Sequence, residues 1–596
     1  MNKAIYCLIL KKVKKVLFVA GTGVSRGLDG SYPTGLVTVA TAALLALASS
    51  MALAAPPDAG ILTREQQPQR QIPQQLPKVE GQIEQAPLAD TGVRITVKGF
   101  KFTGNEGLAT EEELQQLVSA SVGKSLSFRD LQDLASKITE YLKKKGWFLA
   151  RAYLPKQDVT SGVIEFAFIQ GRSDGSLTIR RDKSARISDE TIRAIARNAV
   201  QPDQPLHESN LERSALLMND LPGVSAKASL AAGAVPGTTG VQFDVSEGPL
   251  LSGSVFGDNQ GNRYTGAWRG NGMLTVNDPF RYGDQLSLLL TGSEGLTQGR
   301  AAYSFPLTTS GLKGSISYTG MQYELIGPLS ALNAQGQSHT VDAGVSYPLL
   351  RSRTANITTS ATYEFKALID SDNNVDTDNR QLHSGIIAFN GDKYDTLFGG
   401  GYTTWNAGVT TGSFNNDVAT SLPDTQGAYT HFNLGLSRLQ RLCEHTSINL
   451  SWTAQLSNDN LDTSEKFILG GPNGVRAYPV GEASGDEGQL FNVDLRYDLP
   501  LPAVWGSLQL SGFYDAGEIY LHKQPWTNSI ATATNKNEYW LQGSGVAFNY
   551  IYKDKFSLKG TWAHTIGDNP GRSASGTDAD GRSEANRFWL VGSMYF

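Results

Sequence analysis

The residues of this chain that could act together chemically lie in two segments of its C-terminal third. A glycine-rich stretch from Gly470 to Gly488 contains one arginine, Arg476, and a later stretch from Phe513 to Gly517 contains one acid, Asp515. A planar guanidinium and a carboxylate fit each other through two parallel hydrogen bonds. The sequence alone leaves two interpretations of Arg476 open: an ion pair with Asp515, or a solvated charge on a loop.

Established catalytic motifs are absent from the sequence. It contains no Gly-x-Ser-x-Gly nucleophile motif, no phosphate-binding loop and no His-Glu-x-x-His zinc motif. Its seven histidines are scattered without the spacing of metal ligands. We therefore expect a protein that is not an enzyme and that uses no cofactor and no metal.

The alternation around Asp515 indicates the element that carries it. Leu508, Leu510 and Tyr514 share one parity, so Phe513, Asp515 and Gly517 face the opposite way on a strand. Similar period-2 segments recur from about residue 250 to the C-terminus, where helical periodicity is absent. The clearest of them are 286–290, 341–347, 432–436, 448–456, 491–499, 556–562 and 588–596.

Three features favour a transmembrane antiparallel β-barrel over a soluble sandwich for 250–596. Roughly 350 residues of strand pattern exceed one soluble core, aromatic residues recur near segment ends, and the chain ends on Tyr595 and Phe596. Bacterial outer-membrane barrels resemble one another in a terminal phenylalanine, so we take Phe596 as the barrel's C-terminal signal. At about 22 residues for each strand and its turn, the segment holds about sixteen strands, and Asp515 points into their lumen if Leu510 faces lipid.

Two consecutive segments before the barrel, 93–172 and 173–249, repeat the order strand, helix, helix, strand, strand. In the first segment we expect a strand over 93–97, and helices that begin at Thr110 and Ser127. In the second segment, Ser188 and Ser209 are expected to begin the helices. A repeat of roughly 80 residues is typical of tandem small α+β domains.

The N-terminal 54 residues resemble an extended secretory signal peptide, with lysines at 11–15, an apolar stretch over 36–53 and small residues before Ala55. An uncleaved membrane anchor is the alternative interpretation. Residues 55–92 are a linker rich in Pro and Gln, with room for one short helix over 61–67. After cleavage Cys443 is the one remaining cysteine, which excludes an intrachain disulfide.

Charge and hydropathy argue against a nucleic-acid-binding protein and against a helical membrane protein. The formal net charge is −5, and a nucleic-acid partner would require a basic face. The chain after residue 54 contains no apolar run of about 18 residues, so we expect no transmembrane helix there.

Residues 93–596 resemble the TpsB transporters of two-partner secretion, the haemolysin secretion/activation family of the outer-membrane assembly superfamily. Five motifs carry this resemblance: Tyr153-Leu154-Pro155 with Gln157; Leu221-Pro222-Gly223-Val224; Gly257-Asp258-Asn259 with Gly261, Thr265 and Gly266; Gly474-Val475-Arg476 with Tyr478; and Phe513 with Asp515 and Gly517. The resemblance implies two periplasmic POTRA-like domains followed by an outer-membrane barrel.

The same resemblance implies roles for the two segments described first. The loop 470–488 folds back into the barrel, where Arg476 forms an ion pair with Asp515, and the motif residues Gly474, Val475, Tyr478, Phe513 and Gly517 complete this loop–barrel lock. Ala477 departs from the glycine that many relatives carry, which could alter the backbone at the loop tip. Relatives also carry an N-terminal helix that plugs the barrel, but the prolines of 55–92 allow about two helical turns, which argues against a plug here.

The implied function is export of a secreted exoprotein of the haemolysin, haemagglutinin or adhesin type. The POTRA-like domains would capture this partner unfolded through open strand edges, and its folding at the cell surface would supply directionality. Outer-membrane lipid and the barrel assembly machinery are the other expected partners. Two alternative functions remain: an assembly factor that inserts other barrels, whose members commonly have more than two POTRA domains, and a passive porin, which has none.

Overall fold

The computed structural model describes residues 56–67, 94–233, 238–418 and 425–596. The expected signal peptide and most of the expected linker lie outside these residues. None of the helices within the described ranges is long and apolar enough to cross a membrane.

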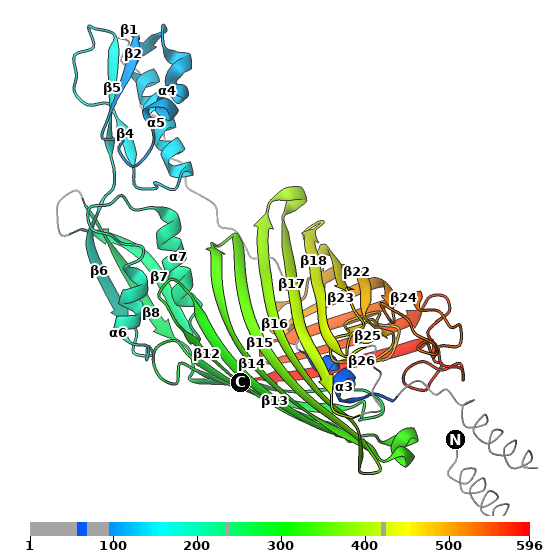
Figure 1. The fold of residues 1–596 in the computed structure, drawn as a ribbon. Helices are drawn as coiled ribbons and strands as arrows, with labels where there is room; N and C mark the ends of the chain where they lie inside the picture. The colour runs from blue at the N-terminus through cyan, green and yellow to red at the C-terminus, as the bar shows by residue number, and fades with distance from the viewer. Residues whose placement is uncertain (1–55, 68–93, 234–237, 419–424) are drawn as a thin grey trace, which may run out of the picture.

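The C-terminal region is a closed barrel of sixteen antiparallel strands, which confirms the predicted fold class (Figure 1). Its strands are β9 Leu251–Asp258, β10 Arg269–Asn277, β11 Gln285–Gly292, β12 Leu296–Pro306, β13 Lys313–Glu324, β14 Ala334–Arg351, β15 Ala355–Asp372, β16 Val375–Asp395, β17 Gly401–Asn416, β18 Gly427–Arg441, β19 Thr446–Ser457, β22 Glu487–Leu499, β23 Ser507–Tyr520, β24 Glu538–Tyr552, β25 Phe556–Thr565 and β26 Asn586–Tyr595. Short 3₁₀ turns lie at Gly327–Leu332, Leu397–Gly399 and Ala503–Trp505.

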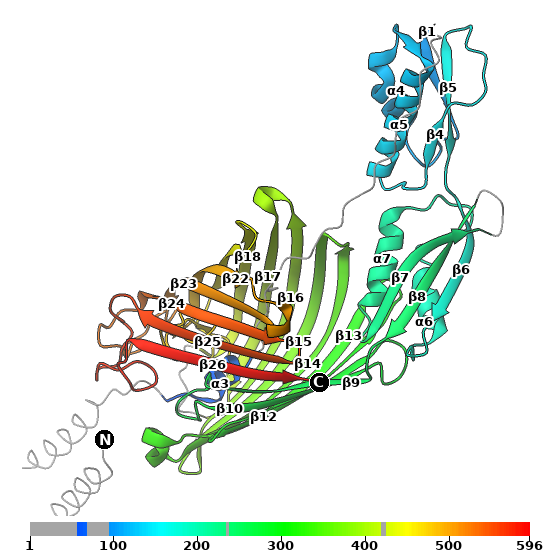
Figure 2. The same ribbon diagram turned by 180° about the vertical axis from the view of Figure 1, so that it is seen from behind.

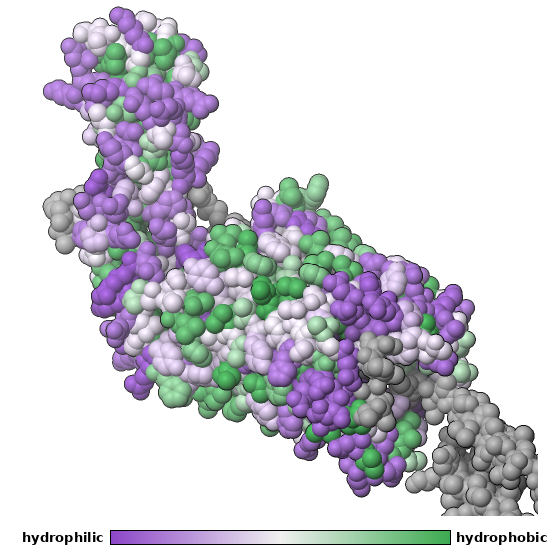
Figure 3. Space-filling model, in the orientation of Figure 1, coloured by the Kyte–Doolittle hydropathy of each residue, from purple (hydrophilic) through white to green (hydrophobic). Residues whose placement is uncertain are grey.

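The alternation along these strands separates an apolar outer face from a polar lumen. Leu290 is 66% exposed and Leu495 is 51% exposed on the outside, whereas Asp515 is completely buried inside. Figure 3 shows apolar residues gathered over the barrel wall, while the surface of the described residues between 94 and 247 is mostly hydrophilic. An apolar outer face is what a lipid bilayer requires, because lipid offers polar side chains no hydrogen-bond partners.

The barrel closes between its first and last strands over a short register. β26 pairs with β9 from Val591–Asp258 to Tyr595–Ser254, whereas β14 and β15 pair along almost their whole length. Phe596 extends this seam, since its backbone exchanges hydrogen bonds of 2.9 and 3.0 Å with Gly253. The terminal residue therefore completes the pairing that closes the barrel.

The first α+β unit contains β1 Arg94–Thr96, β2 Gly99–Thr103, α4 Glu111–Val118, a 3₁₀ turn at Ser119–Ser121, β3 Ser125–Ser127, α5 Phe128–Lys144, β4 Arg151–Tyr153 and β5 Val163–Ile169. Thr110 and Ser127 cap the two helices through complete capping boxes, as predicted. The strand predicted over 93–97 is present as β1, but it lies outside the three-stranded sheet, and the strand β2 was not predicted. Residues 94–96 pair with β3 at the side, and β2 is the strand that enters the three-stranded sheet β2-β5-β4.

The second α+β unit contains β6 Ser173–Arg181, α6 Asp189–Ala196, α7 Glu208–Asn219, β7 Val224–Ala232 and β8 Thr239–Glu247. Its sheet order β6-β8-β7 repeats that of the first unit. Ser188 caps α6 as predicted, but Ser209 does not cap α7. His207 is the cap, because its ring nitrogen accepts the Ser209 N–H at 3.2 Å.

Hydrogen bonds and ion pairs fix the second unit to the turns at one end of the barrel. Arg351, at the end of β14, binds both carboxylate oxygens of Asp220 at 2.7 and 2.9 Å. Arg213 of α7 donates to the Pro348 carbonyl at 2.7 Å. Figures 1 and 2 show α7 and β7 on the side of this unit that is nearer the barrel, and β6 on the far side.

Candidate functional site

A loop from the end of the barrel opposite the α+β units folds back into the lumen. We call residues 470–488 the lid loop. A two-residue pairing of β20 Phe467–Ile468 with β21 Ser484–Gly485 closes its base, and the last two residues already belong to β22. Inside the loop, Val475 N–H donates to the Leu469 carbonyl at 2.8 Å and Tyr478 N–H donates to Val475 at 3.0 Å. The lid loop therefore has a defined fold of its own.

Arg476, at the tip of the lid loop, contacts the barrel wall through Asp515 of β23. Its Nε and Nη2 atoms donate to the two carboxylate oxygens at 2.9 and 2.6 Å, and its backbone N–H donates to the same carboxylate at 3.0 Å. Asp515 is fully buried, and 13% of the Arg476 side chain is exposed. This is the bidentate geometry that a guanidinium and a carboxylate favour.

Two aromatic residues contact Arg476, one at its side chain and the other at its backbone. The guanidinium carbon of Arg476 lies 3.5 Å from the ring centroid of Phe513, which is a close cation–π contact. Trp589 of β26 donates its indole N–H to the Arg476 carbonyl at 2.8 Å. The tip of the lid loop is thus fixed to β23 and also to the last strand of the barrel.

The other predicted residues pack around this ion pair. Val475 and Tyr478 are buried in one apolar cluster with Phe513 and Leu469. A side chain at Gly474 would come within 2.0 Å of the Leu469 carbonyl oxygen, and one at Gly517 within 2.2 Å of the Leu469 side chain. Gly474 therefore allows the lid loop to fold closely against Leu469, and Gly517 allows Leu469 to approach the wall.

Ala477 does not strain the tip. Its φ is not in the left-handed region that favours glycine, and its methyl group is fully buried against Gly543. A Cβ at Gly543 would lie 2.5 Å from that methyl group. The departure from the usual glycine is therefore accommodated by a glycine on the facing strand β24.

Two residues of β22 belong to the site and were not predicted. Asp494 accepts from Nη1 of Arg476 at 2.8 Å, and Asn492 donates to Asp515 at 2.8 Å. Arg476 thus bridges two carboxylates, and Asn492 satisfies a remaining lone pair of Asp515. The alternation of Phe491, Val493 and Leu495 predicts that Asn492 and Asp494 face the lumen. It does not predict that they lie beside Arg476.

The outer part of the lid loop contacts the loop 566–585 between β25 and β26. Glu482 is buried and accepts from Asn569 at 2.7 Å and from the Ala579 N–H at 2.5 Å. Burial, together with the nearby Asp578, raises the pKa of the Glu482 carboxyl from 4.5 to about 7. These contacts connect the lid loop to a second outer loop.

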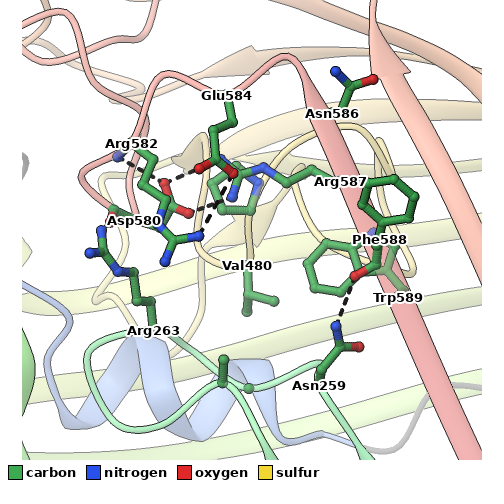
Figure 4. Close-up of a pocket in the computed structure, with 13 residues that line it drawn as sticks. Asn259, Arg263, Val480, Asp580, Arg582, Glu584, Asn586, Arg587, Phe588 and Trp589 are labelled. Atoms are coloured by element: carbon green, nitrogen blue, oxygen red, sulfur yellow. Dashed lines mark hydrogen bonds and ion pairs between the residues drawn. The ribbon is translucent and has the colours of Figure 1, made fainter.

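A cavity of about 250 Å³ lies where the lid loop, the loop 566–585 and the turn after β9 meet (Figure 4). The charged side chains that line it bind one another or a backbone carbonyl. Arg587 binds Asp580 at 2.5 Å, and Arg263 donates to the Asp580 carbonyl at 2.6 Å. Asn259 donates to the Phe588 carbonyl at 2.8 Å and accepts from the Leu590 N–H at 2.7 Å, so its side chain extends the β9–β26 pairing.

A short helix, α3 Ala59–Glu65, lies inside the barrel, so the sequence argument against a plug is wrong. Leu62 is completely buried in a cluster with Tyr323 and Leu368 of the wall. The Ala59 N–H donates to Asp370 at 2.9 Å. The prolines limit the helix to seven residues, but contacts with the wall stabilise it, and these were not visible in the sequence.

Charged side chains hold the first turn of α3. Asp58 caps the helix and accepts from Arg380 of β16 at 3.0 Å. Arg380 also binds Asp370 of the wall and Asp462 of the segment that follows β19, and all three residues are nearly buried. At the other end of the helix, Gln66 accepts from Arg269 at 2.9 Å.

The turn that follows β9 joins these parts and was noted in the sequence only through the resemblance. Asp258 is buried and binds Arg269 at 2.8 Å, and Arg269 in turn holds Gln66. Asn262 donates to Glu65 at 3.2 Å. The turn after β9 therefore contacts the seam, the α3 helix and the outer loops.

In the described ranges, no group of His, Cys, Asp or Glu side chains could hold a metal ion.

Comparison with known proteins identifies the family. The model for haemolysin secretion/activation proteins ShlB/FhaC/HecB matches residues 237–535, and the model for the ShlB-type POTRA domain matches residues 95–171. The heme/hemopexin transporter protein HuxB of Haemophilus influenzae strain 86-028NP is 26% identical over 541 residues, which cover 88% of this chain and 94% of HuxB. The outer membrane transporter CdiB of Dickeya dadantii is 24% identical over 477 residues, which cover 76% of this chain and 82% of CdiB.

Among solved structures, CdiB from Escherichia coli superimposes with a TM-score of 0.69 at 18% identity, covering 96% of this chain and all of CdiB. That likeness shows the fold, and the match over half of the sequence shows the family. The chain belongs to the haemolysin secretion/activation family, and it is an outer-membrane transporter with periplasmic N-terminal domains that exports a secreted partner protein.

Proposed function

We propose that the chain binds its partner exoprotein unfolded in the periplasm, through the two α+β units, and passes it as an extended chain through the barrel lumen. No enzymatic step is part of this proposal. Outer-membrane lipid surrounds the barrel, and the barrel assembly machinery inserts it. The membership of the family favours export over the insertion of other barrels.

Passage through the lumen is supported by the way in which two elements that fill it are held in place. The α3 helix and the lid loop both lie inside the barrel, and each is held by side-chain contacts to the wall rather than by strand pairing with it. An element held by a few ion pairs and apolar contacts can leave without breaking the barrel's hydrogen bonds. We propose that both elements move when the partner enters, which leaves room for an extended chain.

The chemistry of the partner is a second part of the proposal. HuxB is named a heme/hemopexin transporter. We propose a large exoprotein of the haemolysin, haemagglutinin or adhesin type, and a haem- or hemopexin-binding one is the first class to test.

Deletion of residues 93–246 tests the division of labour. We expect the remaining barrel to insert into the outer membrane and conduct ions, while release of the partner exoprotein to the surface is abolished. The partner is identified as the exoprotein whose surface release stops when the transporter gene is deleted. Normal export by the truncated chain would contradict the capture role, and unchanged exoproteins after gene deletion would contradict the proposed function.

A further inference from the structure

A hollow of about 370 Å³ lies on the outer face of the barrel wall, where β15, β16 and β17 run side by side (Figure 1). Its volume is within the range of about 300–1,000 Å³ that is typical of small-molecule sites. Two rungs of outward-facing residues from the three strands line it: Tyr363, Gly385 and Thr411, and next to them Ala361, Ile387 and Val409. The hollow is therefore part of the surface that faces lipid.

Gly385 produces the hollow, because it places no side chain between Tyr363 and Thr411, its partners on the neighbouring strands. A Cβ at Gly385 would meet no atom closer than the Thr411 carbonyl oxygen at 3.9 Å, so the space above it is open. The backbone does not require glycine here, since the φ of Gly385 is not in the left-handed region. A gap in a wall forfeits packing contacts. A ligand that fills the gap would recover them.

A tyrosine–histidine pair borders the hollow on one side. The Tyr363 hydroxyl lies 2.7 Å from Nδ1 of His383, which precedes Gly385 by two residues on the same face of β16. The His383 ring also packs against Phe365, with their centroids 4.9 Å apart. When the phenol donates to Nδ1, the ring proton lies on Nε2. No residue that the structure describes accepts from Nε2, so the pair offers one N–H donor at the rim of the hollow.

The position of this donor selects between the two leaflets of the membrane. β16 runs toward the barrel end that holds the second α+β unit, because it is parallel to β14, whose Arg351 binds Asp220 there. That end is periplasmic, so His383 lies on the outer side of the hollow and Phe389 on its periplasmic side. A lipid of the outer leaflet carries its carbonyl groups on the outer side of its acyl chains. A lipid of the inner leaflet carries them at the opposite end.

The surroundings favour an acyl chain and a neutral acceptor over a phosphate group. The outward-facing residues of 359–367, 381–389 and 405–413 are uncharged, because Glu364 and Lys366 point into the lumen, where they bind each other at 2.8 Å. Phosphate groups in proteins are typically bound by Arg or Lys. The acceptor for the His383 donor is therefore an ester or amide carbonyl.

We propose that the hollow binds one acyl chain of lipopolysaccharide, the glycolipid of the outer leaflet, and that His383 donates from Nε2 to the carbonyl at the start of that chain. The chain fills the space above Gly385 and lies against Ala361, Ile387 and Val409. The site is on the opposite side of the wall from the lumen, so it gives the barrel a lipid ligand and is not a step of export.

A second tyrosine–histidine pair on the outer face provides a matched control. The Tyr318 hydroxyl of β13 lies 2.7 Å from Nδ1 of His339 of β14. Here the tyrosine covers the neighbouring glycine, since a Cβ at Gly320 would lie 3.1 Å from the Tyr318 hydroxyl oxygen. This pair has the same polar chemistry without the open space found at Gly385.

Native mass spectrometry of the full-length transporter, extracted from outer membranes with a mild detergent, tests the proposal. Wild type should retain one glycolipid per barrel, identified by the lipid A fragment that it releases on activation. Gly385→Ile fills the hollow, so retention should fall about tenfold or more as buried methylene contacts are lost. His383→Phe keeps a ring but not the donor and should lower retention about fivefold. The control His339→Phe should stay within about twofold of wild type.

A heat-modifiable band first shows that each variant is folded, and His383→Phe decides the outcome if Gly385→Ile does not fold. Wild type without glycolipid, a phospholipid in its place, or equal retention by wild type and the variants at Gly385 and His383 would overturn the proposal. A pair of barrels that Gly385→Ile separates would overturn it too, because the hollow would then be a contact between two copies. No exoprotein is present, so none of these outcomes bears on export.

Discussion

Arg476 binds two carboxylates, so the substitutions that test it have unequal expected effects. Asp515 receives two side-chain hydrogen bonds and one backbone hydrogen bond from Arg476, whereas Asp494 receives one. Removing one member of a buried ion pair leaves the other charge uncompensated, at a cost of about 3–5 kcal/mol. The loop tip should therefore depend more on Asp515 than on Asp494.

Arg476→Ala and Asp515→Ala should each reduce export strongly at normal barrel abundance. Because either change breaks the same contact, the double variant should be little worse than either single variant. Surface release of the partner and barrel abundance are measured for all three. Fully additive losses, or single variants that export normally, would show that the two residues do not form a functional pair.

Arg476→Lys separates charge from geometry. Lysine keeps the positive charge but cannot bind two carboxylates through a planar fork or lie flat against Phe513. We expect the level of export by Arg476→Lys to lie between the levels of wild type and Arg476→Ala. Asp494→Asn, which removes one acceptor of the same arginine, should reduce export less. Export equal to wild type would mean that charge alone holds the loop.

Glu482 makes the contact between the two outer loops depend on pH. Its pKa is raised from 4.5 to about 7 by burial, so the contact is fully stabilised below about pH 4.5 and loses this stabilisation as the pH rises through 7. Hydrogen exchange of residues 566–585, corrected for intrinsic rates, should quicken by about tenfold or more between pH 5 and pH 8. Glu482→Gln should abolish this dependence, and an equal pH response in both chains would contradict the assignment.

At the scale of elements, removal of the α3 helix from the lumen should raise the conductance of the pore. Leu62 is fully buried in the cluster that packs α3 against the wall, and burying an apolar side chain of this size is worth about 1.5–3 kcal/mol. Leu62→Asp loses this and buries a charge, so the helix should leave the lumen while the barrel remains folded.

Planar-bilayer conductance checks this expectation. The mean conductance of Leu62→Asp should exceed that of wild type severalfold, and the exposed neighbour Gln67, changed to Ala, serves as the matched control. Unchanged conductance in Leu62→Asp would show that α3 does not obstruct the pore.

Elements with local signals were predictable from the sequence, and elements fixed by distant contacts were not. Many barrel strands carry period-2 alternation, as in β19 and β22, so their strand character was predictable. The choice of a barrel depended also on the length of this region, its aromatic residues and Phe596. The capping boxes at Thr110 and Ser127 are equally local. The strand β2 was missed because Gly99 interrupts the alternation of 95–97, and Phe100 resumes it with the opposite parity.

Contacts between elements explain the remaining errors. The α3 helix was judged by its length, but its stability comes from Asp370, Arg380 and the wall around Leu62. Asp494 could be placed in the lumen by parity, whereas its contact with Arg476 depends on how the lid loop turns inside the barrel. No spacing rule in the sequence reports such a contact.

At the scale of the whole molecule, the proposed function combines a capture region, a channel and two obstructions that move, all in one chain. The second α+β unit is fixed to the barrel by Asp220 and Arg351, so a bound segment would be held near one end of the pore. The α3 helix, the lid loop and the seam meet at the turn after β9. The proposed export uses no ATP-binding site of this chain, whose sequence contains no phosphate-binding loop.

The most direct test of the central claim is translocation by the purified chain alone. The transporter is reconstituted in liposomes with its periplasmic units inside, the partner's N-terminal fragment is enclosed unfolded, and the fraction digested by external protease is measured over time. A heat-modifiable band confirms that each barrel is folded. We predict that fragment becomes accessible with wild-type transporter and not with the chain lacking 93–246. Equal accessibility in both, or none with a folded wild-type barrel, would contradict the account.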